Sequence, residues 1–327
     1  MAVDEMRSVL DEAADWQKAG RAVAMATVIE TWGSAPRPVG SQLAADADGN
    51  FIGSVSGGCV EGAVITEAGD VIASGVPKVL EFGVADETAW RVGLACGGRI
   101  RILVEPLGRI DELMALRRGR EAVAVVTELD SGRQILVRRA DASPELEAAF
   151  RFDQSRVQAG LAGEVFVHIH NPPLKLVITG AVHIAQSLVP MALAAGYDIS
   201  VVDPRGAFAT AERFPGVALY DEWPDSFMGG HGLDARTAVL ALTHDPKIDD
   251  PALRAALKSE AFYIGALGSK KTSASRRERL MALGFGEADL ARIHGPVGLN
   301  IGAKGAAEIA VSIIAEMTKV LRLGDAA

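Results

Sequence analysis

The regular alternation of strands and helices in the second half of the chain constrains the fold more than any other feature. The apolar, β-branched runs in "KLVITG", "DISVVDPR", "TAVLALTHDP" and "FYIGALGS" each lead into a polar turn, and the last helix reads "AKGAAEIAVSIIAEMTKVLRL". Strands that alternate with helices are joined by helical crossovers and pair in parallel. The pattern therefore predicts the α/β class, with a doubly wound parallel sheet.

The first half of the chain is organised differently. Strands are predicted over 22–29, 42–45, 51–55, 78–82, 99–104 and 122–127, and helices over 4–18, 60–74 and 110–117. This is a mixed α+β pattern. At 327 residues the chain is longer than a single core usually grows, and Pro172 and Pro173 punctuate it between the two patterns. We expect two domains, residues 1–165 and residues 166–327.

The composition indicates which kinds of partner and which cellular compartment are to be expected. The chain has 42 acidic and 33 basic side chains and lacks the basic stripe of a phosphate-backbone binder, so nucleic acid is not expected as a partner. Only two cysteines, Cys59 and Cys96, are present, which fits a reducing compartment. The acidic, amphipathic start is unlike a secretory leader. We expect a cytoplasmic protein.

Residues 176–197 contain no Asp, Glu, Lys or Arg and are long enough to cross a bilayer. The segment nevertheless begins with a short β-branched run that ends at Gly180, and it continues with His183, Gln186 and Pro190. This order fits a strand, a turn and a helix in the core of an α/β domain. No membrane span is expected.

The segment "KLVITGAVHIA" has the pattern of a dinucleotide-binding turn. Asp203 follows Gly180 by 23 residues, close to the spacing of about 20 at which an acid meets a ribose hydroxyl. Val182 stands where the pattern has its middle glycine, and its branched side chain occupies space that a pyrophosphate would need. Two interpretations stay open: a Rossmann-like domain without a dinucleotide, and one that holds a nucleotide or pterin-type ligand less closely.

Three polar loops follow predicted strands, at the edge where open α/β sheets bind ligands. Glycine and serine before helices, with lysine nearby, favour an anion such as phosphate, although each loop alone is also explained by turn and capping chemistry. Together they predict a ligand crevice. Its candidate residues are Gly180, His183, Asp203, His244, Asp245, Gly268, Ser269, Lys270, Gly298 and Asn300. For His168 and His170 a structural role is favoured over a metal site.

Several longer motifs occur together and in one order: "GSVSGGCVEGAV", "LACGGRIRILVEPL", "VITGAVHIAQSLVP", "THDPKIDDPAL", "YIGALGSKKTSASRRERL" and "HGPVGLNIGAKGAAEIAVSIIAE". In these motifs, over about residues 10–322, the chain resembles the XdhC/CoxI family of molybdenum-cofactor accessory proteins. Val182 and Asn300 depart from the family pattern, which usually has glycine and commonly aspartate there.

The resemblance implies an N-terminal XdhC/CoxI domain and a C-terminal Rossmann domain. It also implies a role in binding and protecting the molybdenum cofactor, in supporting exchange of an oxo for a sulfido ligand, and in delivery to the apo molybdenum hydroxylase. A cysteine desulfurase as sulfur donor and a homodimer are further implied. On this interpretation the protein is a cofactor-insertion chaperone rather than a turnover enzyme.

The resemblance singles out Cys59, and after it Cys96, as catalytic candidates, with Cys59 as a candidate molybdenum ligand. A thiol at a helix start lies near the positive end of the helix dipole and near free N–H groups, which favour the thiolate. Thiolate is a soft ligand suited to molybdenum or to a persulfide. The alternative is two buried cysteines that pack as small hydrophobes. The other cofactor-binding candidates of this half are Arg37, Ser56, Gly57, Gly58, Glu61, Gly97 and Gly98.

Two other functions remain open at this point. One is an NAD(P)-dependent oxidoreductase, suggested by the Rossmann-like half, against which Val182 argues. The other is a sulfurtransferase or hydrolase that forms a covalent intermediate on Cys59. The second needs an activating base, and His183, His244 and His294 are the candidates.

Overall fold

The computed structural model describes residues 8–33, 37–83, 98–160 and 163–324, and the chain divides into two compact units that meet at Pro172 and Pro173. The predicted boundary between residues 165 and 166 lies inside the strand β9 (Glu164–His170), which pairs on both sides with strands of the N-terminal unit. A strand stays with its pairing partners, so the division falls at the proline pair that follows β9. Each unit is described by itself.

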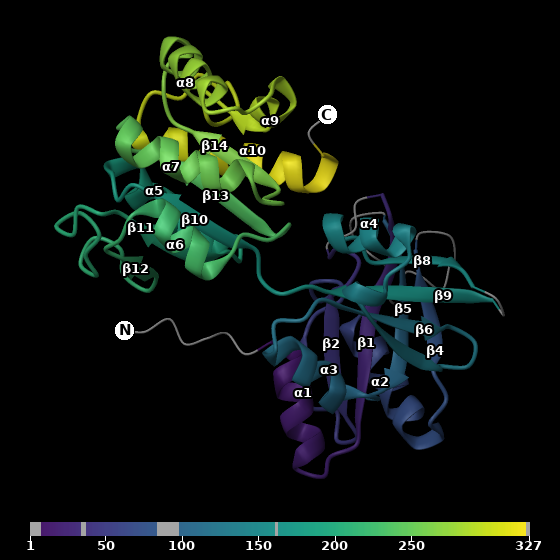
Figure 1. Ribbon diagram of the computed structural model, residues 1–327. Coiled ribbons are helices and arrows are strands. Elements are labelled where there is room, and N and C mark those ends of the chain that lie inside the picture. The colour runs from purple at the N-terminus through teal and green to yellow at the C-terminus, as the bar shows by residue number, and fades with distance from the viewer. Residues whose placement is uncertain (1–7, 34–36, 84–97, 161–162, 325–327) are drawn as a thin grey trace. The chain divides into compact units, whose positions relative to one another are not determined.

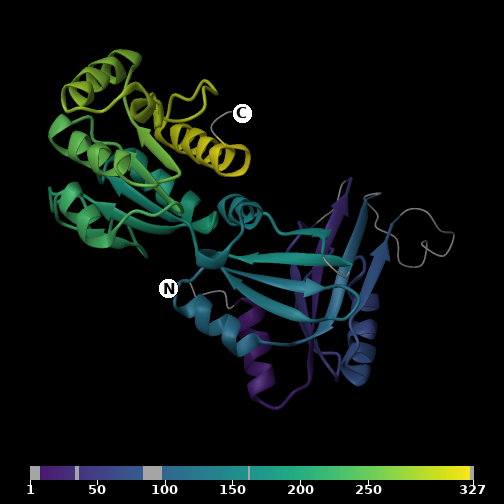
Figure 2. The same ribbon diagram turned by 45° about the vertical axis from the view of Figure 1, so that its right-hand side comes forward.

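The N-terminal unit contains an antiparallel five-stranded sheet with α2 (Glu61–Ser74) packed on one face (Figures 1 and 2). Its strands, in sheet order, are β3 (Phe51–Gly53), β2 (Gln42–Asp46), β1 (Val23–Trp32), β5 (Arg99–Pro106) and β4 (Lys78–Phe82). Val64, Ala68 and Val71 recur at helical spacing on α2 and are buried against β1 and β5.

The other face of this sheet packs against further elements of the same unit. A four-stranded antiparallel sheet contributes β7 (Gln134–Arg138), β6 (Val123–Glu128), β9 and β8 (Arg156–Ala159), in that order. The remaining helices are α1 (Val9–Lys18), α3 (Ile110–Arg118), α4 (Pro144–Phe152) and a short 3-10 turn over Arg139–Asp141. Met25 and Leu103 from the first sheet meet Val125 and Phe166 from the second in buried clusters.

The C-terminal unit is built on a six-stranded parallel sheet. Its strands, in sheet order, are β12 (Ala218–Tyr220), β11 (Asp198–Val202), β10 (Lys175–Thr179), β13 (Thr237–Ala241), β14 (Tyr263–Ala266) and β15 (Ile293–His294). In chain order of this unit the arrangement is 3-2-1-4-5-6, which is the doubly wound Rossmann topology. The predicted fold class is confirmed.

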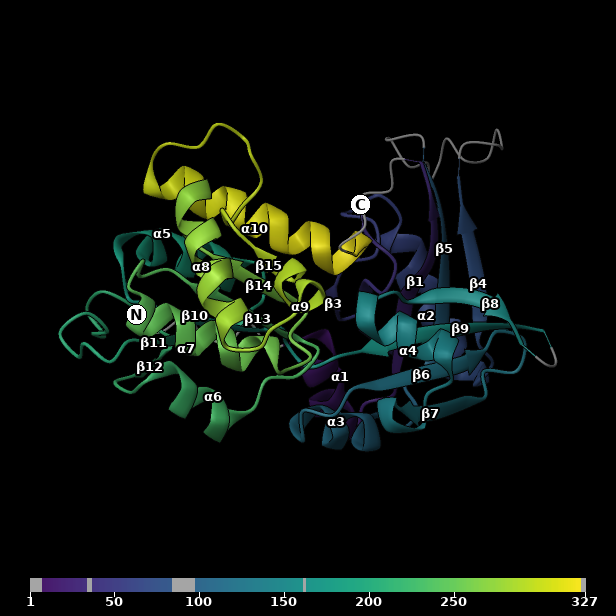
Figure 3. The ribbon, with the colours of Figure 1, turned by 45° about the horizontal axis from the view of Figure 1, so that its top comes forward.

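Helices cover both faces of the parallel sheet (Figure 3). α5 (His183–Ala194) and α10 (Ala306–Leu323) pack on one face. The opposite face carries α6 (Pro224–His231), α7 (Pro246–Leu257), α8 (Lys270–Ala282) and α9 (Glu287–Ala291). Because all strands are parallel, their carboxyl ends and the loops that follow lie at one edge, with the topological switch between β10 and β13.

The uncharged stretch 176–197 folds as β10, a turn at Gly180 and the twelve-residue helix α5. Among the described residues, no helix has both the length and the apolar character needed to cross a bilayer. This agrees with the prediction of a strand, a turn and a helix.

Candidate functional site

The loop between β3 and α2 carries Cys59, which is exposed. Gly57 and Gly58 have φ values of 78° and 116°, in the left-handed region that favours glycine. Two such residues in succession curl the chain back toward the start of α2. The alternative of a buried Cys59 that packs as a small hydrophobe is therefore wrong.

The curled loop surrounds the carboxylate of Glu61, which is only 7% exposed. Oε1 accepts hydrogen bonds from Ser54 Oγ (2.7 Å) and from the main-chain N–H groups of Val55 (3.2 Å), Ser56 (2.8 Å) and Gly57 (3.1 Å). Oε2 accepts from Ser56 Oγ (2.5 Å), Gly58 N (2.9 Å) and Val60 N (3.2 Å). Burial acts to raise the pKa of Glu61, but these hydrogen bonds outweigh it and lower the pKa to about 2.

This arrangement changes the role expected for the loop amides. The sequence predicted that free N–H groups at a helix start would lie near Cys59. In the structure, the amides of residues 55–58 and of Val60 donate to Glu61. Those amides are therefore not available to a ligand of the thiol. Glu61 instead fixes the shape of the loop that presents Cys59.

The remaining candidate residues of the N-terminal unit do not all lie at the Cys59 loop. Arg37 is exposed and donates from Nε to the carbonyl of Ser54 over 3.4 Å, so it lies against the same loop. Gly98 is buried, and its Cα is 3.6 Å from the position of a Cβ on Gly33. Cys96 and Gly97 lie outside the described residues.

Arg101, in β5, is paired with carboxylates of three other strands. Its guanidinium contacts Glu30 (2.5 Å), Glu81 (3.4 Å) and Glu164 (2.9 Å), and its side chain is 15% exposed. Hydrogen bonding to Glu164 raises its pKa. Three carboxylates already surround the charge, so Arg101 joins strands rather than binding an anion. Arg99, the other arginine of this motif, is exposed, with its guanidinium 5.3 Å from the ring of Trp32.

In the C-terminal unit, the turn after β10 packs against the loop after β13. Gly180 has a φ of 105°, and a Cβ there would stand 2.5 Å from Thr243 Cγ2. Glycine is therefore required by conformation and by space. Val182 is the N-cap residue of α5 and packs partly against the core. His183 beside it is exposed, with Nδ1 3.5 Å from Gln186 Oε1.

Asp203, at the end of β11, is fully buried. Oδ2 accepts from Ala181 N (2.8 Å), and the Arg205 guanidinium donates to both carboxylate oxygens over 2.8 and 2.9 Å. Burial acts to raise the pKa of Asp203, but these bonds lower it overall. The acid that stood at the spacing for a ribose contact is thus bonded within the protein.

The loop after β13 is organised around Asp249, the buried acid in the first turn of α7. Its carboxylate accepts from Thr243 N (3.2 Å), Thr243 Oγ1 (2.6 Å) and His244 N (3.0 Å). His244 is exposed with a φ of 65°, and Asp245 caps α7 by accepting from Lys247 N. Arg276 Nη2 is 3.6 Å from Asp249 Oδ2. The loop after β13 is thereby linked to α8.

Other candidates at this edge have capping or packing roles. Ser269 caps α8 through its Oγ, which accepts from Thr272 N over 3.1 Å, and Lys270 is exposed in the first turn. Gly268 has a φ of 150°, and a Cβ there would meet Thr272 at 3.0 Å.

The turn at Gly298 packs against α10, which covers the face of the parallel sheet opposite to α7 and α8. Gly298 N donates to Glu316 Oε2 (2.8 Å), and a Cβ on Gly298 would be 2.3 Å from Ser312 Oγ. Tyr263 donates its hydroxyl to the same Glu316 oxygen, and His294 Nδ1 is 3.5 Å from Oε1. Asn300 is exposed. The structure thus brings Gly180, Asp203 and the loop after β13 together, whereas Gly298 belongs to the α10 face.

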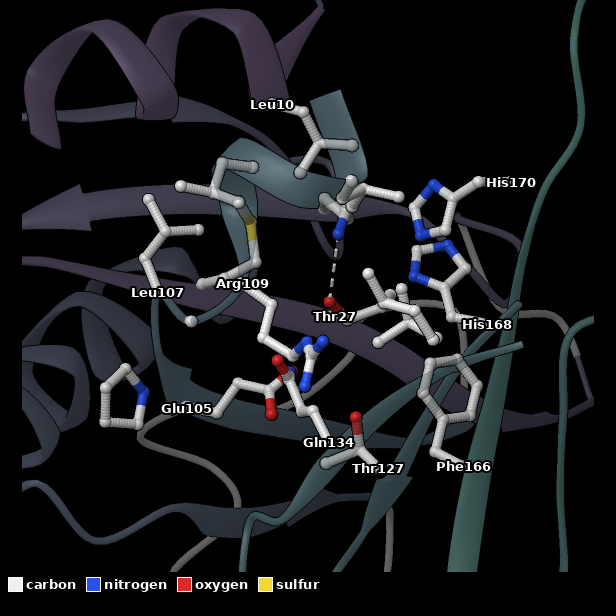
Figure 4. Close-up of a pocket in the computed structure, with 18 residues that line it drawn as sticks. Leu10, Thr27, Glu105, Leu107, Arg109, Thr127, Gln134, Phe166, His168 and His170 are labelled. Carbon is white, nitrogen blue, oxygen red and sulfur yellow. Dashed lines mark hydrogen bonds between the residues drawn. The ribbon is translucent and has the colours of Figure 1, made fainter. Parts of the chain in front are cut away.

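Sequence reasoning missed a cavity of about 40 Å³ between the two sheets of the N-terminal unit (Figure 4). Glu105 points toward Gln134 on one side, and burial raises its pKa to about 7. On the other side the ring centroids of His168 and His170 lie 4.1 Å apart, with the rings tilted by 50°. Burial lowers both pKa values, that of His168 to about 4. No group of three or more His, Cys, Asp or Glu side chains suited to a metal occurs within the described part of the chain.

Comparisons with known proteins cover both units. A model of the XdhC and CoxI family matches residues 16–83, and a model of the XdhC Rossmann domain matches residues 176–317. The chain is 30% identical over 319 residues to the molybdenum cofactor insertion chaperone PaoD of Escherichia coli K12, with 97% of this chain and 89% of that protein covered.

Two further relatives agree with this match. A protein of Bacillus subtilis, named as a probable subunit of xanthine dehydrogenase, is 28% identical, with 90% of this chain and 91% of that protein covered. A crystal structure from Bacillus halodurans, described as a xanthine dehydrogenase, superposes with a TM-score of 0.72 at 26% identity and covers 97% of this chain and 96% of that chain. The likeness extends over both units.

Proposed function

The chain belongs to the XdhC and CoxI family, and we propose that it binds a molybdenum cofactor as cargo and delivers it to an apo molybdenum hydroxylase. The observation that carries the proposal is the 30% identity to a molybdenum cofactor insertion chaperone across 97% of this chain. Both the N-terminal unit and the Rossmann unit are shared with that relative, so the likeness is not confined to a common fold.

The loop of Cys59 has the donor chemistry that such a cargo needs. Molybdenum favours soft sulfur ligands, and Cys59 presents an exposed thiol. Apart from its two neighbours in the chain, no described residue has an atom within 4 Å of a Cβ position on Gly58, so a ligand can approach the backbone beside the thiol. Arg37 holds a positive charge against the same loop and suits an anionic cargo.

Glu61 acts on the cargo through the loop rather than by contact. Its carboxylate is filled by seven donors from residues 54–60, all within 3.2 Å. A loop tied to one buried charge has few other conformations available, so Cys59 stays in one place before the cargo arrives.

Finer parts of the proposal follow from the family and from the exposed thiol. We propose that a cysteine desulfurase supplies sulfur while the cofactor is held, that two copies of the chain form a homodimer, and that the protein works in the cytoplasm. Light scattering coupled to size exclusion tests the dimer. Pull-down of the desulfurase and of the apo-hydroxylase tests the two partners.

A second candidate function is favoured by the exposure of Cys59: that of a sulfurtransferase. Its thiolate would attack the outer sulfur of a donor persulfide, so that Cys59 gains a persulfide and the donor leaves as a thiolate. Mass spectrometry after exposure to a sulfur donor would show a gain of one sulfur atom on Cys59. An unchanged mass excludes this function.

The main test is purification from cells that make molybdenum cofactor, under anaerobic handling, followed by assay of molybdenum and of the oxidised pterin. We expect both to co-purify at substoichiometric to equal amounts. The matched control is the same protein from cells that cannot make the cofactor. Consistent absence of pterin and molybdenum from the first preparation would overturn the proposal.

A further inference from the structure

The C-terminal unit has a ligand-site candidate of its own, built without residues of the N-terminal unit that carries Cys59. A cavity of about 240 Å³ opens between residues of α8 and the start of α7. The residues that line it and carry the argument are His244, Asp249, Lys271, Thr272, Ser275 and Arg276.

Arg276 is the residue that marks this cavity as a binding site. Its side chain is only 3% exposed, and Nη2 donates to the carbonyl of Leu267 over 2.9 Å. Nε and Nη1 are buried and have no hydrogen-bond partner among the described residues. These two nitrogens carry three of the five N–H groups of a guanidinium. A buried charged group whose donors lack acceptors is unfavourable, and an incoming acceptor would relieve this cost.

The charges around the cavity favour an anion as that acceptor. Arg279 is paired in bidentate fashion with Asp250 over 2.6 and 2.9 Å, so its charge is compensated. Arg276 and the exposed Lys271 contribute two further positive charges. Asp249 is the one carboxylate among the described lining residues, and at 3.6 Å from Arg276 Nη2 it offsets one of these charges. The lining therefore keeps a net positive charge.

The remaining donors suit a tetrahedral oxyanion. Thr272 and Ser275 bring hydroxyl groups, and Lys271 and Thr272 lie in the first turn of α8, where the helix dipole attracts negative charge. A guanidinium with free N–H groups binds phosphate oxygens with good geometry. A volume of about 240 Å³ is somewhat below that of a typical drug-sized pocket, which suits a small anion or one end of a larger ligand.

We propose that this cavity binds a phosphate group through Arg276, with Lys271 and the hydroxyls of Thr272 and Ser275 as further donors. The site does not depend on the proposed function, because it is argued from the C-terminal unit alone. The sequence predicts an anion at this edge of the sheet, where glycine and serine precede a helix and lysines follow. The cavity is lined by Lys271 and also by Arg276, about one and a half helical turns further on, which the sequence analysis did not single out.

The test is isothermal titration calorimetry on the full-length protein at constant ionic strength. Inorganic phosphate and a nucleoside monophosphate are titrated separately, with acetate as the carboxylate probe. We expect the phosphate-bearing probes to bind and acetate to bind at least about tenfold more weakly. Tighter binding of the nucleotide indicates that the phosphate belongs to a larger ligand, and equal binding indicates free phosphate. Both results support the site.

Variants distinguish the site from general attraction to a positive surface. Arg276→Met should weaken phosphate binding by about tenfold or more, and Lys271→Met by about threefold. The matched control is Lys258→Met, an exposed lysine at the far end of α7, which should leave binding unchanged. Should Arg276→Met fail to fold, Lys271→Met at the surface still carries the comparison. Equal binding of phosphate and acetate, or equal affinity of Lys271→Met and Lys258→Met, would overturn the proposal.

Discussion

The carboxylate of Asp203 accepts the main-chain N–H of Ala181 over 2.8 Å and so joins the end of β11 to the turn after β10. The same carboxylate accepts from Nε and Nη2 of Arg205, one on each oxygen. A ribose hydroxyl would have to displace these bonds from a buried charged group, which is costly. The Rossmann topology is present, but its acid stabilises the strand ends.

Binding of NAD(H) by the unmodified protein should therefore be weak or absent. Val182 adds to the effect, because its branched side chain stands where the dinucleotide pattern has glycine. We expect Val182→Gly to gain measurable affinity for NADH, at a cost of about 1 kcal/mol in stability. Titration followed by nicotinamide fluorescence measures the affinity. Tight binding of NADH by the unmodified protein would contradict this argument and support an oxidoreductase.

Cys59→Ser should separate cargo binding from folding. Serine keeps the size and a hydrogen-bonding group but loses the soft sulfur, and Cys59 is exposed, so the core is unaffected. We expect unchanged thermal stability and a clear loss of co-purified molybdenum. Cys96→Ser should have a similar but weaker effect. Unchanged molybdenum content in Cys59→Ser would remove the thiol from the proposed site.

Glu61→Gln should loosen the loop that presents Cys59. The amide cannot accept from all the donors that the carboxylate accepts from, so we expect a loss of about 2 kcal/mol near neutral pH. The pKa of Glu61 is lowered to about 2, so the stability it contributes is present above pH 4.5 and is lost as the pH falls toward 2. Urea unfolding should show the difference from the unmodified protein shrinking in that window.

The control for this variant is Asp70→Asn, an exposed acid on the same helix that interacts only with Lys78 among the described ion pairs. Its effect should stay within about 0.5 kcal/mol. If both variants behave alike, the donors around Glu61 contribute nothing beyond a surface charge.

Glu105→Gln should also change how stability depends on pH, but in the opposite sense to Glu61→Gln. Burial raises the pKa of Glu105 to about 7, so its contribution is fully present below pH 4.5 and is lost as the pH rises to 7. Glutamine stays neutral, and we expect it to be more stable than the unmodified protein by about 3 kcal/mol at pH 8 and similar at pH 4.5.

Urea unfolding of both proteins from pH 4.5 to 8 tests this expectation. The stability that His168 contributes depends on pH in the opposite sense to that of Glu105. The pKa of His168 is lowered to about 4, so the contribution of His168 is lost as the pH falls from 6.5. The comparison of the two proteins cancels the histidine contribution. A difference that does not vary with pH would show that Glu105 does not titrate in this range.

The elements that sequence patterns could predict are those with their own apolar periodicity. β4 was predicted with the bounds that the structure has, and β5, β6 and α3 within two residues at either end. The parallel sheet followed from the alternation of strands and helices. β7, β8 and α4 were not predicted, because their residues are mostly exposed or half-buried and carry little alternation.

Sequence patterns predicted less of the candidate site than of the fold. Glycine content and a thiol marked the loop of Cys59, but the pattern could not show that Glu61 would take up the loop amides. Arg276 was missed because an arginine inside a polar helix looks solvated in sequence. In the structure α8 packs beside α7, and the Arg276 side chain is only 3% exposed. Partner choice among charged groups is set by distances between elements that are remote in sequence.

The two edges of the parallel sheet are its shortest strands, β12 with three residues and β15 with two. A strand from another chain would find very few main-chain groups to pair with at either edge, which protects the sheet from edge-to-edge aggregation. A protein that docks on this unit must therefore recognise side chains on its helices and loops. Specificity toward a partner then resides in residues that substitution can change without disturbing the sheet.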